Sequence, residues 1–208
     1  MNDPHKDAEV LHAGAPIESA RAVAILVHGR GGSARDFLSL SRWIDLDDVA
    51  YVAPQARGNT WYPYSFLTPI PQNEPFVGSA IAKLESVVSG LLERGVASER
   101  IAVVGFSQGA CLSSEFVARH PRRYLALAAL TGGLIGPKDT PRAYDGSLDG
   151  TPVFLGASDP DPHVPWWRVE ETSRVLSGLG GKVELIRYAN QPHMINDDQM
   201  EHVRAMLG

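Results

Sequence analysis

Short apolar runs alternate with longer amphipathic segments along most of this chain, and this alternation limits the fold more than any other feature. The apolar runs are continuous, which is typical of strands buried on both faces of a parallel sheet. These expected strands are residues 22–28, 49–54, 100–106, 124–130, 151–157 and 182–188. Apolar residues recur at helical spacing in the intervening segments, which are residues 34–44, 76–95, 107–120, 166–180 and 195–207. We therefore predict an α/β fold with a mainly parallel central sheet and helices on both faces.

The segment from residue 54 to 76 departs from this rhythm. It contains five prolines and five aromatic residues. The prolines disfavour a helix or an inner strand, and the aromatic residues are too many for a merely solvated loop. We expect an ordered loop near the active site. Its Trp61, Tyr62 and Phe66, together with Trp166, are candidate substrate-binding residues, although each would serve equally well in the core.

The length of the chain, 208 residues, suits one domain with a full core. We expect a single domain over residues 1–208, in which residues 1–20 form an N-terminal extension. Six strands, their helices and the loop at 54–76 use nearly all of the chain. No separate cap domain therefore fits between the strands at 124–130 and 151–157, and the active site is expected to be a fairly open cleft.

The composition excludes several kinds of partner. The formal net charge is −5 and the sequence has no basic run, so nucleic acid is not expected to bind. The apolar runs are too short to span a bilayer, and residues 1–14 have no apolar stretch typical of a signal peptide. Cys111 is the only cysteine, which agrees with a reducing compartment. We expect a cytoplasmic monomer or homodimer that binds a small molecule.

The pattern G-x-S-x-G, at residues 105–109, is the strongest chemical signal in the sequence. It joins an expected strand to an expected helix, so Ser107 lies at a sharp turn that exposes its hydroxyl. Glycine at 105 and 109 allows this turn to tighten without a side-chain collision. The start of the helix also offers free backbone N–H groups and a positive potential beside the serine oxygen. Ser107 is therefore the predicted nucleophile.

A serine hydroxyl needs a general base within hydrogen-bond reach. In a parallel sheet such a partner lies on a loop that follows a strand. His193 lies between the last expected strand and the last helix, and it is the favoured base. His28 and His163 also lie at strand ends and remain candidates. The other four histidines lie in the N-terminal extension or far along helices.

Two aspartates, Asp159 and Asp161, follow the expected strand at 151–157, and both are candidates for the acid that orients the base. One of them is also expected to cap the next helix. A metal site formed by these aspartates and His163 is less favoured, because Pro160 and Pro162 hinder convergence of three neighbouring side chains. We predict no metal ligands.

Acyl transfer also requires hydrogen-bond donors for the developing oxyanion. The backbone N–H of Gln108, directly after the nucleophile, is one expected donor. The second is expected from the glycine-rich turn at residues 28–33, where Arg30 is the best candidate and Gly29 and Gly31 are its neighbours. We expect His28 to support this turn by hydrogen bonds. A phosphate-binding loop fits less well, because the turn lacks the Lys-Ser/Thr ending.

These motifs together resemble the phospholipase/carboxylesterase family of α/β-hydrolases, which includes bacterial carboxylesterases and acyl-protein thioesterases. The resemblance covers about residues 20 to 207. It rests on LVHGRGG at 26–32, GFSQGA at 105–110, DPHVP at 161–165 and PHMI at 192–195. It implies that Ser107 is the nucleophile, His193 the base, and Asp161 rather than Asp159 the acid.

The resemblance also implies that the backbone N–H groups of Arg30 and Gln108 form the oxyanion hole, although many members have an apolar residue where Arg30 stands. The activity it implies is that of a cofactor-free serine carboxylesterase that acts through an acyl-enzyme. The loop at 54–76 resembles that of small hydrolases found near aromatic-ring degradation genes, which favours short-chain or aromatic esters, or thioesters.

Three alternatives remain. The first is acyl-protein thioesterase or lysophospholipase activity within the same family. The second is a low-turnover ligand-binding module that retains the fold. The third is a dienelactone-type hydrolase, which would favour cysteine at position 107, whereas Cys111 lies one helical turn later and is expected to be buried packing.

Overall fold

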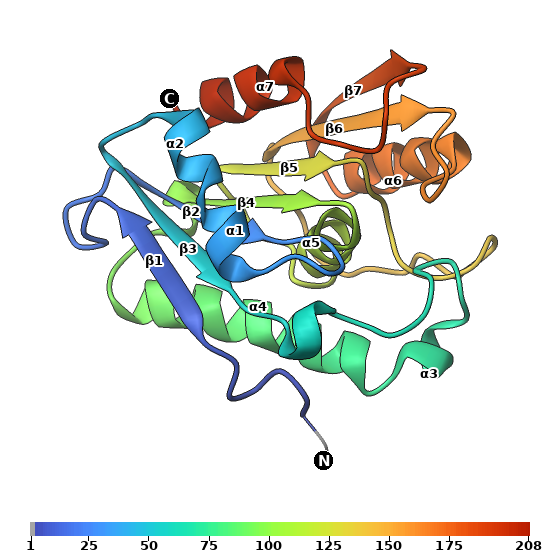
Figure 1. Ribbon diagram of the computed structural model, residues 1–208, viewed down its shortest axis with the longest axis horizontal. Coiled ribbons are helices and arrows are strands. Elements are labelled where there is room, and N and C mark those ends of the chain that lie inside the picture. The colour runs from blue at the N-terminus through green and yellow to red at the C-terminus, as the bar shows by residue number, and fades with distance from the viewer. Residues whose placement is uncertain (1–2) are drawn as a thin grey trace.

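A computed structural model describes residues 3–208 of the chain, and its centre is one seven-stranded sheet (Figure 1). The strands are β1 (Val10–Gly14), β2 (Ala22–Val27), β3 (Val49–Pro54), β4 (Ile101–Phe106), β5 (Ala126–Leu130), β6 (Pro152–Asp159) and β7 (Lys182–Ala189). Their order in the sheet is β1-β3-β2-β4-β5-β6-β7. β1 pairs antiparallel with β3, and the other neighbours are parallel. The predicted α/β fold is confirmed.

The inner strands bury both faces, because successive side chains point to opposite sides of a sheet. In β2, for example, Val23 and Ile25 belong to one apolar cluster, whereas Ala24 and Leu26 belong to another. Continuous apolar runs are therefore required at these strands. β7 differs from the prediction in this respect: it is an edge strand, and its residues are all exposed or half-buried.

Helices cover both faces of the sheet, as predicted. Those packed on the first cluster are α4 (Phe76–Glu93), α5 (Gln108–Arg119) and α6 (Trp166–Gly178). Those packed on the second cluster are α1 (Ala34–Leu38), α2 (Leu40–Ile44) and α7 (Asp197–Leu207). The predicted single helix at 34–44 is wrong in one detail, because Ser39 separates α1 from α2. The backbone N–H and Oγ of Ser39 both donate to the carbonyl of Asp36, which closes the first helix.

The segment at 54–76 is an ordered loop that carries two short helical turns, η1 (Arg57–Asn59) and α3 (Ile70–Asn73). The prolines of this loop predict that no helix forms here, but α3 does form, because its proline lies in the first turn, where no backbone N–H is needed. A further short turn, η2 (Ser98–Arg100), precedes β4. No helix among residues 3–208 is long and apolar enough to cross a membrane.

Residues 131–150, between β5 and β6, contain no helix or strand, so no cap domain is inserted there. Buried charged groups hold this segment in place. The Glu115 carboxylate, on α5, accepts hydrogen bonds from the Ile135 N–H at 3.0 Å and from the Tyr144 hydroxyl at 3.2 Å. Arg168, fully buried on α6, donates to the carbonyl oxygens of Gly136 and Pro137 at 2.6 and 2.9 Å.

The predicted N-terminal extension is part of the fold, although its first two residues lie outside the described chain. It contributes β1 to the sheet edge and buries His5 completely. The His5 Nδ1 accepts from the Arg57 N–H at 3.1 Å, so its Nε2 donates to the Trp61 carbonyl at 3.0 Å. This pairing needs a neutral ring. Burial lowers the pKa of His5 below its ordinary value, although the hydrogen bond to Trp61 acts in the opposite direction.

The free energy of unfolding is therefore expected to decrease on acidification, and His5→Gln should reduce this decrease. The unfolded chain takes up a proton at His5 at a higher pH than the folded chain does. The stabilisation from neutral His5 is thus complete above about pH 6.5 and is lost below it, by up to about 1.4 kcal/mol per pH unit. Urea unfolding at several pH values measures this. The exposed His12, replaced by glutamine, is the matched control; identical pH slopes for wild type and His5→Gln would contradict the prediction.

Candidate active site

Ser107 lies in the turn between β4 and α5, with φ 54° and ψ −118°. This positive φ is costly for a residue with a side chain, and such strain is found chiefly at functional positions. The Ser107 N–H donates to the Leu130 carbonyl at 3.0 Å, and its carbonyl accepts from the Cys111 N–H at 3.0 Å. The backbone is thus fixed on both sides while the hydroxyl remains available.

The two glycines of the motif permit this turn through close packing. A Cβ at Gly109 would collide with the carbonyl oxygen of Val27 on β2, and a Cβ at Gly105 would lie 2.6 Å from the Ser113 Oγ. Glycine at both positions therefore lets α5 approach the sheet closely. The predicted strand–turn–helix arrangement of the motif is confirmed.

Three predicted residues from three loops meet here. The Oγ of Ser107 lies 2.8 Å from the Nε2 of His193, and the Nδ1 of His193 lies 2.7 Å from the Oδ2 of Asp161. Asp161 follows β6 and His193 follows β7, so both lie at the carboxyl edge of the sheet. Since Asp161 is ionised and accepts at Nδ1, the ring presents its other nitrogen to the serine hydroxyl. This arrangement can remove a proton from Ser107.

Asp161 is held as a carboxylate. Its side chain is fully buried, and its Oδ1 accepts from the backbone N–H groups of His163 and Val164, both at 2.8 Å. Burial alone would raise the pKa of Asp161, but the hydrogen bonds from His193 and from the two N–H groups outweigh it, so the pKa lies below its ordinary value. Neither aspartate caps α6, contrary to the sequence-based expectation, because the capping position is Pro165 and Asp159 is paired with Arg187.

The remaining histidine candidates have other positions. His28 is buried and supports its turn as predicted: its Nδ1 donates to the Gly29 carbonyl at 2.8 Å and its Nε2 accepts from the Ala56 N–H at 3.1 Å. Burial lowers the pKa of His28. His163 is exposed, and its ring meets the His193 ring edge to face, with centroids 4.9 Å apart. Among residues 3–208, no cluster of three metal-type ligands is present.

The glycine-rich turn after β2 lies directly against the nucleophile. A Cβ at Gly29 would be 3.3 Å from the Phe106 carbonyl oxygen and 3.5 Å from the Ser107 Cβ. Among the backbone hydrogen bonds of the described chain, none uses the N–H of Arg30 or of Gln108. Both N–H groups are thus without a backbone partner in the described chain, as an oxyanion donor must be.

A cleft of about 500 Å³ opens over Ser107 and His193. Tyr62 and Phe66 line it, as predicted, whereas Trp61 does not. Trp61 is fully buried beneath the loop, and its Nε1 donates to the His28 carbonyl at 2.8 Å. Trp166 is also absent from the lining; the Arg187 guanidinium covers its ring at 5.4 Å.

Cys111 forms part of the cleft floor but is not a reactive thiol. It is fully buried, and burial raises its pKa to about 12. A thiolate is therefore absent at neutral pH. This agrees with the expected packing role and disfavours a cysteine nucleophile at this site.

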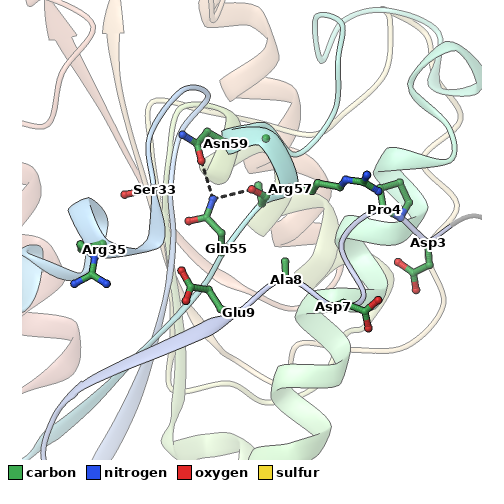
Figure 2. Close-up of a pocket in the computed structure, with 12 residues that line it drawn as sticks. Asp3, Pro4, Asp7, Ala8, Glu9, Ser33, Arg35, Gln55, Arg57 and Asn59 are labelled. Carbon is green, nitrogen blue, oxygen red and sulfur yellow. Dashed lines mark hydrogen bonds between the residues drawn. The ribbon is translucent and has the colours of Figure 1, made fainter.

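A second hollow, of about 660 Å³, lies between the N-terminal segment and η1 (Figure 2). Several of its polar side chains are committed to the fold: Gln55 donates to the Asn59 Oδ1 at 3.0 Å, and the Ser33 Oγ caps α1. No histidine lines this hollow. It is larger than the cleft over Ser107 but lacks a nucleophile–base pair, so we assign the chemistry to the smaller one.

One residue of the cleft lining and one residue that supports the lining were not found from the sequence. Phe106 packs its ring 5.2 Å from the His193 ring and lines the cleft. Asn73, fully buried in α3, accepts from the Tyr64 N–H at 2.9 Å and donates to the Ser65 carbonyl at 3.0 Å. The G-x-S-x-G pattern already contained Phe106 as its variable residue, but no local signal distinguished Asn73.

Comparison with known proteins places the chain in a family. A family model described as phospholipase/carboxylesterase matches residues 8–208. The crystal structure of a phospholipase/carboxylesterase from Dyadobacter fermentans is similar, with 40% identity, a TM-score of 0.93, and coverage of 97% of this chain and 96% of that chain. Acyl-protein thioesterase 1 from Saccharomyces cerevisiae is 27% identical over 175 residues, which is 74% of this chain and 77% of that protein.

The carboxylesterase from Bacillus cereus has the same fold, with a TM-score of 0.76 at 17% identity and coverage of 97% of this chain and 94% of that chain. The resemblance inferred from the motifs is thus confirmed. The chain belongs to the phospholipase/carboxylesterase family of α/β-hydrolases, and by that membership it is a hydrolase of ester bonds.

Proposed function

We propose that Ser107, His193 and Asp161 form the catalytic triad of a serine carboxylesterase that acts through an acyl-enzyme. The observation that carries this proposal is the unbroken chain of contacts from Asp161 to His193 at 2.7 Å and from His193 to the Ser107 Oγ at 2.8 Å. These three residues lie at an open cleft, which Ser107 and His193 line. The backbone N–H groups of Arg30 and Gln108 have no backbone partner among residues 3–208. No cofactor takes part in the proposed reaction.

In this mechanism the Ser107 Oγ attacks the ester carbonyl carbon while its proton passes to the His193 Nε2. The N–H groups of Arg30 and Gln108 bind the resulting oxyanion. His193 then gives the proton to the leaving alcohol, and the acyl group remains on Ser107. Water, activated by the same histidine, releases the acid. Asp161 stabilises the imidazolium that forms in both halves of the reaction.

We propose small esters with short-chain or aromatic groups as substrates. The cleft volume, about 500 Å³, lies at the lower end of typical ligand sites. Aromatic walls from Tyr62, Tyr64 and Phe66 suit flat or short apolar groups. Thioesters are a second candidate, because relatives such as the Saccharomyces cerevisiae protein are named acyl-protein thioesterases.

We also treat residues 1–208 as a single functional domain, since one sheet runs through the described chain. The one cysteine is unpaired, which is compatible with a reducing compartment such as the cytoplasm. Neither assignment bears on the proposed chemistry.

A series of p-nitrophenyl esters of increasing acyl length tests the substrate class. We expect steady hydrolysis of the acetate and butyrate, and a kcat/KM for the palmitate lower by about tenfold or more, because the cleft cannot bury a long chain. Initial rates of p-nitrophenol release measure this. An acetyl thioester run in parallel compares the second candidate directly.

Treatment with a fluorophosphonate is the control for this series. The reagent should abolish hydrolysis and add its mass to one peptide, the one that contains Ser107. Undiminished activity in the modified protein would reject the serine mechanism. Faster hydrolysis of the palmitate than of the butyrate would reject the proposed substrate class.

A further inference from the structure

The Arg30 side chain is exposed, yet its guanidinium binds the wall of the cleft. Its Nη1 donates to the Pro63 carbonyl at 2.9 Å, and its Nη2 donates to the carbonyls of Tyr62 and Tyr64 at 2.9 and 2.7 Å. One guanidinium therefore holds three consecutive carbonyl oxygens. A planar fork of N–H donors can do this, whereas the single ammonium of lysine cannot span the three positions.

Gln108 binds an overlapping part of the same segment. Its Oε1 accepts from the Trp61 N–H at 2.9 Å and from the Thr60 hydroxyl at 3.3 Å, and its Nε2 donates to the Tyr62 carbonyl at 2.8 Å. Gln108 is buried, with 5% of its surface exposed. The two residues that the proposed function assigns to the oxyanion hole thus both use their side chains to bind residues 60–64.

The turn that carries the Arg30 N–H requires such support. Gly29, Gly31 and Gly32 surround it, and Gly31 adopts φ +77° in open space, where a Cβ would meet nothing within 4 Å. Glycine-rich backbone has wide conformational freedom, so the direction of the Arg30 N–H is not fixed locally. The Gly31 N–H donates to the Asn59 carbonyl at 2.8 Å, which again ties the turn to the loop.

We propose that Arg30 is a positioning residue: its guanidinium fixes its own backbone N–H in the oxyanion hole by holding residues 62–64 of the cleft wall. One residue, Arg30, then connects the cleft wall that contacts the substrate to the backbone N–H that binds the oxyanion. This inference rests on the proposed function, because the oxyanion hole has a role only in acyl transfer.

The test compares Arg30→Met and Arg30→Lys with wild type. Both variants keep the backbone N–H and a long stem, but neither can hold three carbonyls. We expect kcat for p-nitrophenyl acetate to fall about 10- to 100-fold, because the donor is displaced rather than removed. KM should change less than about threefold, since uniform binding is preserved. Inhibition by phenylboronic acid, whose oxygen occupies the oxyanion hole, should weaken in parallel with kcat.

Arg35→Met is the matched control, since Arg35 is exposed on α1 and outside the cleft, and its kcat should equal that of wild type. Hydrogen exchange of residues 59–66 should quicken in Arg30→Met but not in Arg35→Met. Unchanged kcat in Arg30→Met, with Ser107 still labelled by a fluorophosphonate, would overturn this inference alone. A kcat in Arg30→Lys equal to that of wild type would also overturn it, because a positive charge without the contact to three carbonyls would then be enough for full activity. Wild-type protein that is neither active nor labelled would instead reject the proposed function and this inference with it.

Discussion

Replacement of Ser107 by alanine is expected to lower kcat for p-nitrophenyl acetate by about a millionfold, which is the scale seen when a serine triad loses its nucleophile. The acyl-enzyme cannot form without the Ser107 Oγ, and His193 then has no hydroxyl to deprotonate. The residual rate should exceed the uncatalysed rate, because the cleft and the oxyanion donors remain. Active-site-titrated initial rates measure the loss.

Two controls make this result specific. Ser114→Ala removes another buried α5 hydroxyl, one that has no hydrogen-bond partner in the described chain, and it should leave kcat within about twofold of wild type. The double variant Ser107→Ala/His193→Ala should be no slower than Ser107→Ala, because the two residues act as one unit. A Ser107→Ala protein that retains a tenth of wild-type activity would place the nucleophile elsewhere.

The second large effect is on stability. Glu115→Gln is expected to lower the free energy of unfolding by about 3–5 kcal/mol, the usual cost of removing one member of a buried charge network. Glu115 is 1% exposed and accepts from the Arg119 Nε at 2.7 Å, with Arg142 at 3.7 Å. Glutamine keeps the shape of the side chain, so the loss isolates the charge. The Arg119 guanidinium would lose its carboxylate, and the almost buried Arg142 guanidinium would keep only Glu171, at 3.2 Å.

Urea unfolding followed by fluorescence measures this change, and an unaltered m-value shows that the folded state is otherwise the same. Glu201→Gln, which neutralises an exposed carboxylate on α7, is the control and should shift stability by no more than about 0.5 kcal/mol. A loss below about 1 kcal/mol in Glu115→Gln would mean that the arginines are satisfied without this carboxylate.

The sequence predicted best what is built from contiguous residues. β4, the Ser107 turn and α5 form one uninterrupted segment, so strand, motif and helix could be recognised together. β1 was missed because it is five residues long and half-exposed, and it forms only because the edge of β3 supplies its hydrogen-bond partners. No pattern within the N-terminal segment alone indicates that edge.

In the site, too, the residues whose roles depend on contacts far along the chain could not be identified from the local sequence. Spacing could not distinguish Asp161 from Asp159, since the choice depends on partners about thirty positions away: His193 faces one, and Arg187 pairs with the other. The buried position of Trp61 likewise depends on a bond to the His28 carbonyl, 33 positions earlier in the chain. Family resemblance supplied the aspartate but not the tryptophan.

The two ends of the molecule differ in how they could be attached to a surface. α7 ends at the edge of the sheet opposite the carboxyl ends of the strands, so the C-terminus lies away from the cleft (Figure 1). The N-terminal segment instead packs against the loop that forms the cleft wall. The His5 ring makes this contact by hydrogen bonds to the backbone of Arg57 and Trp61. Immobilisation through the C-terminal end would therefore orient the enzyme with its entrance facing the medium.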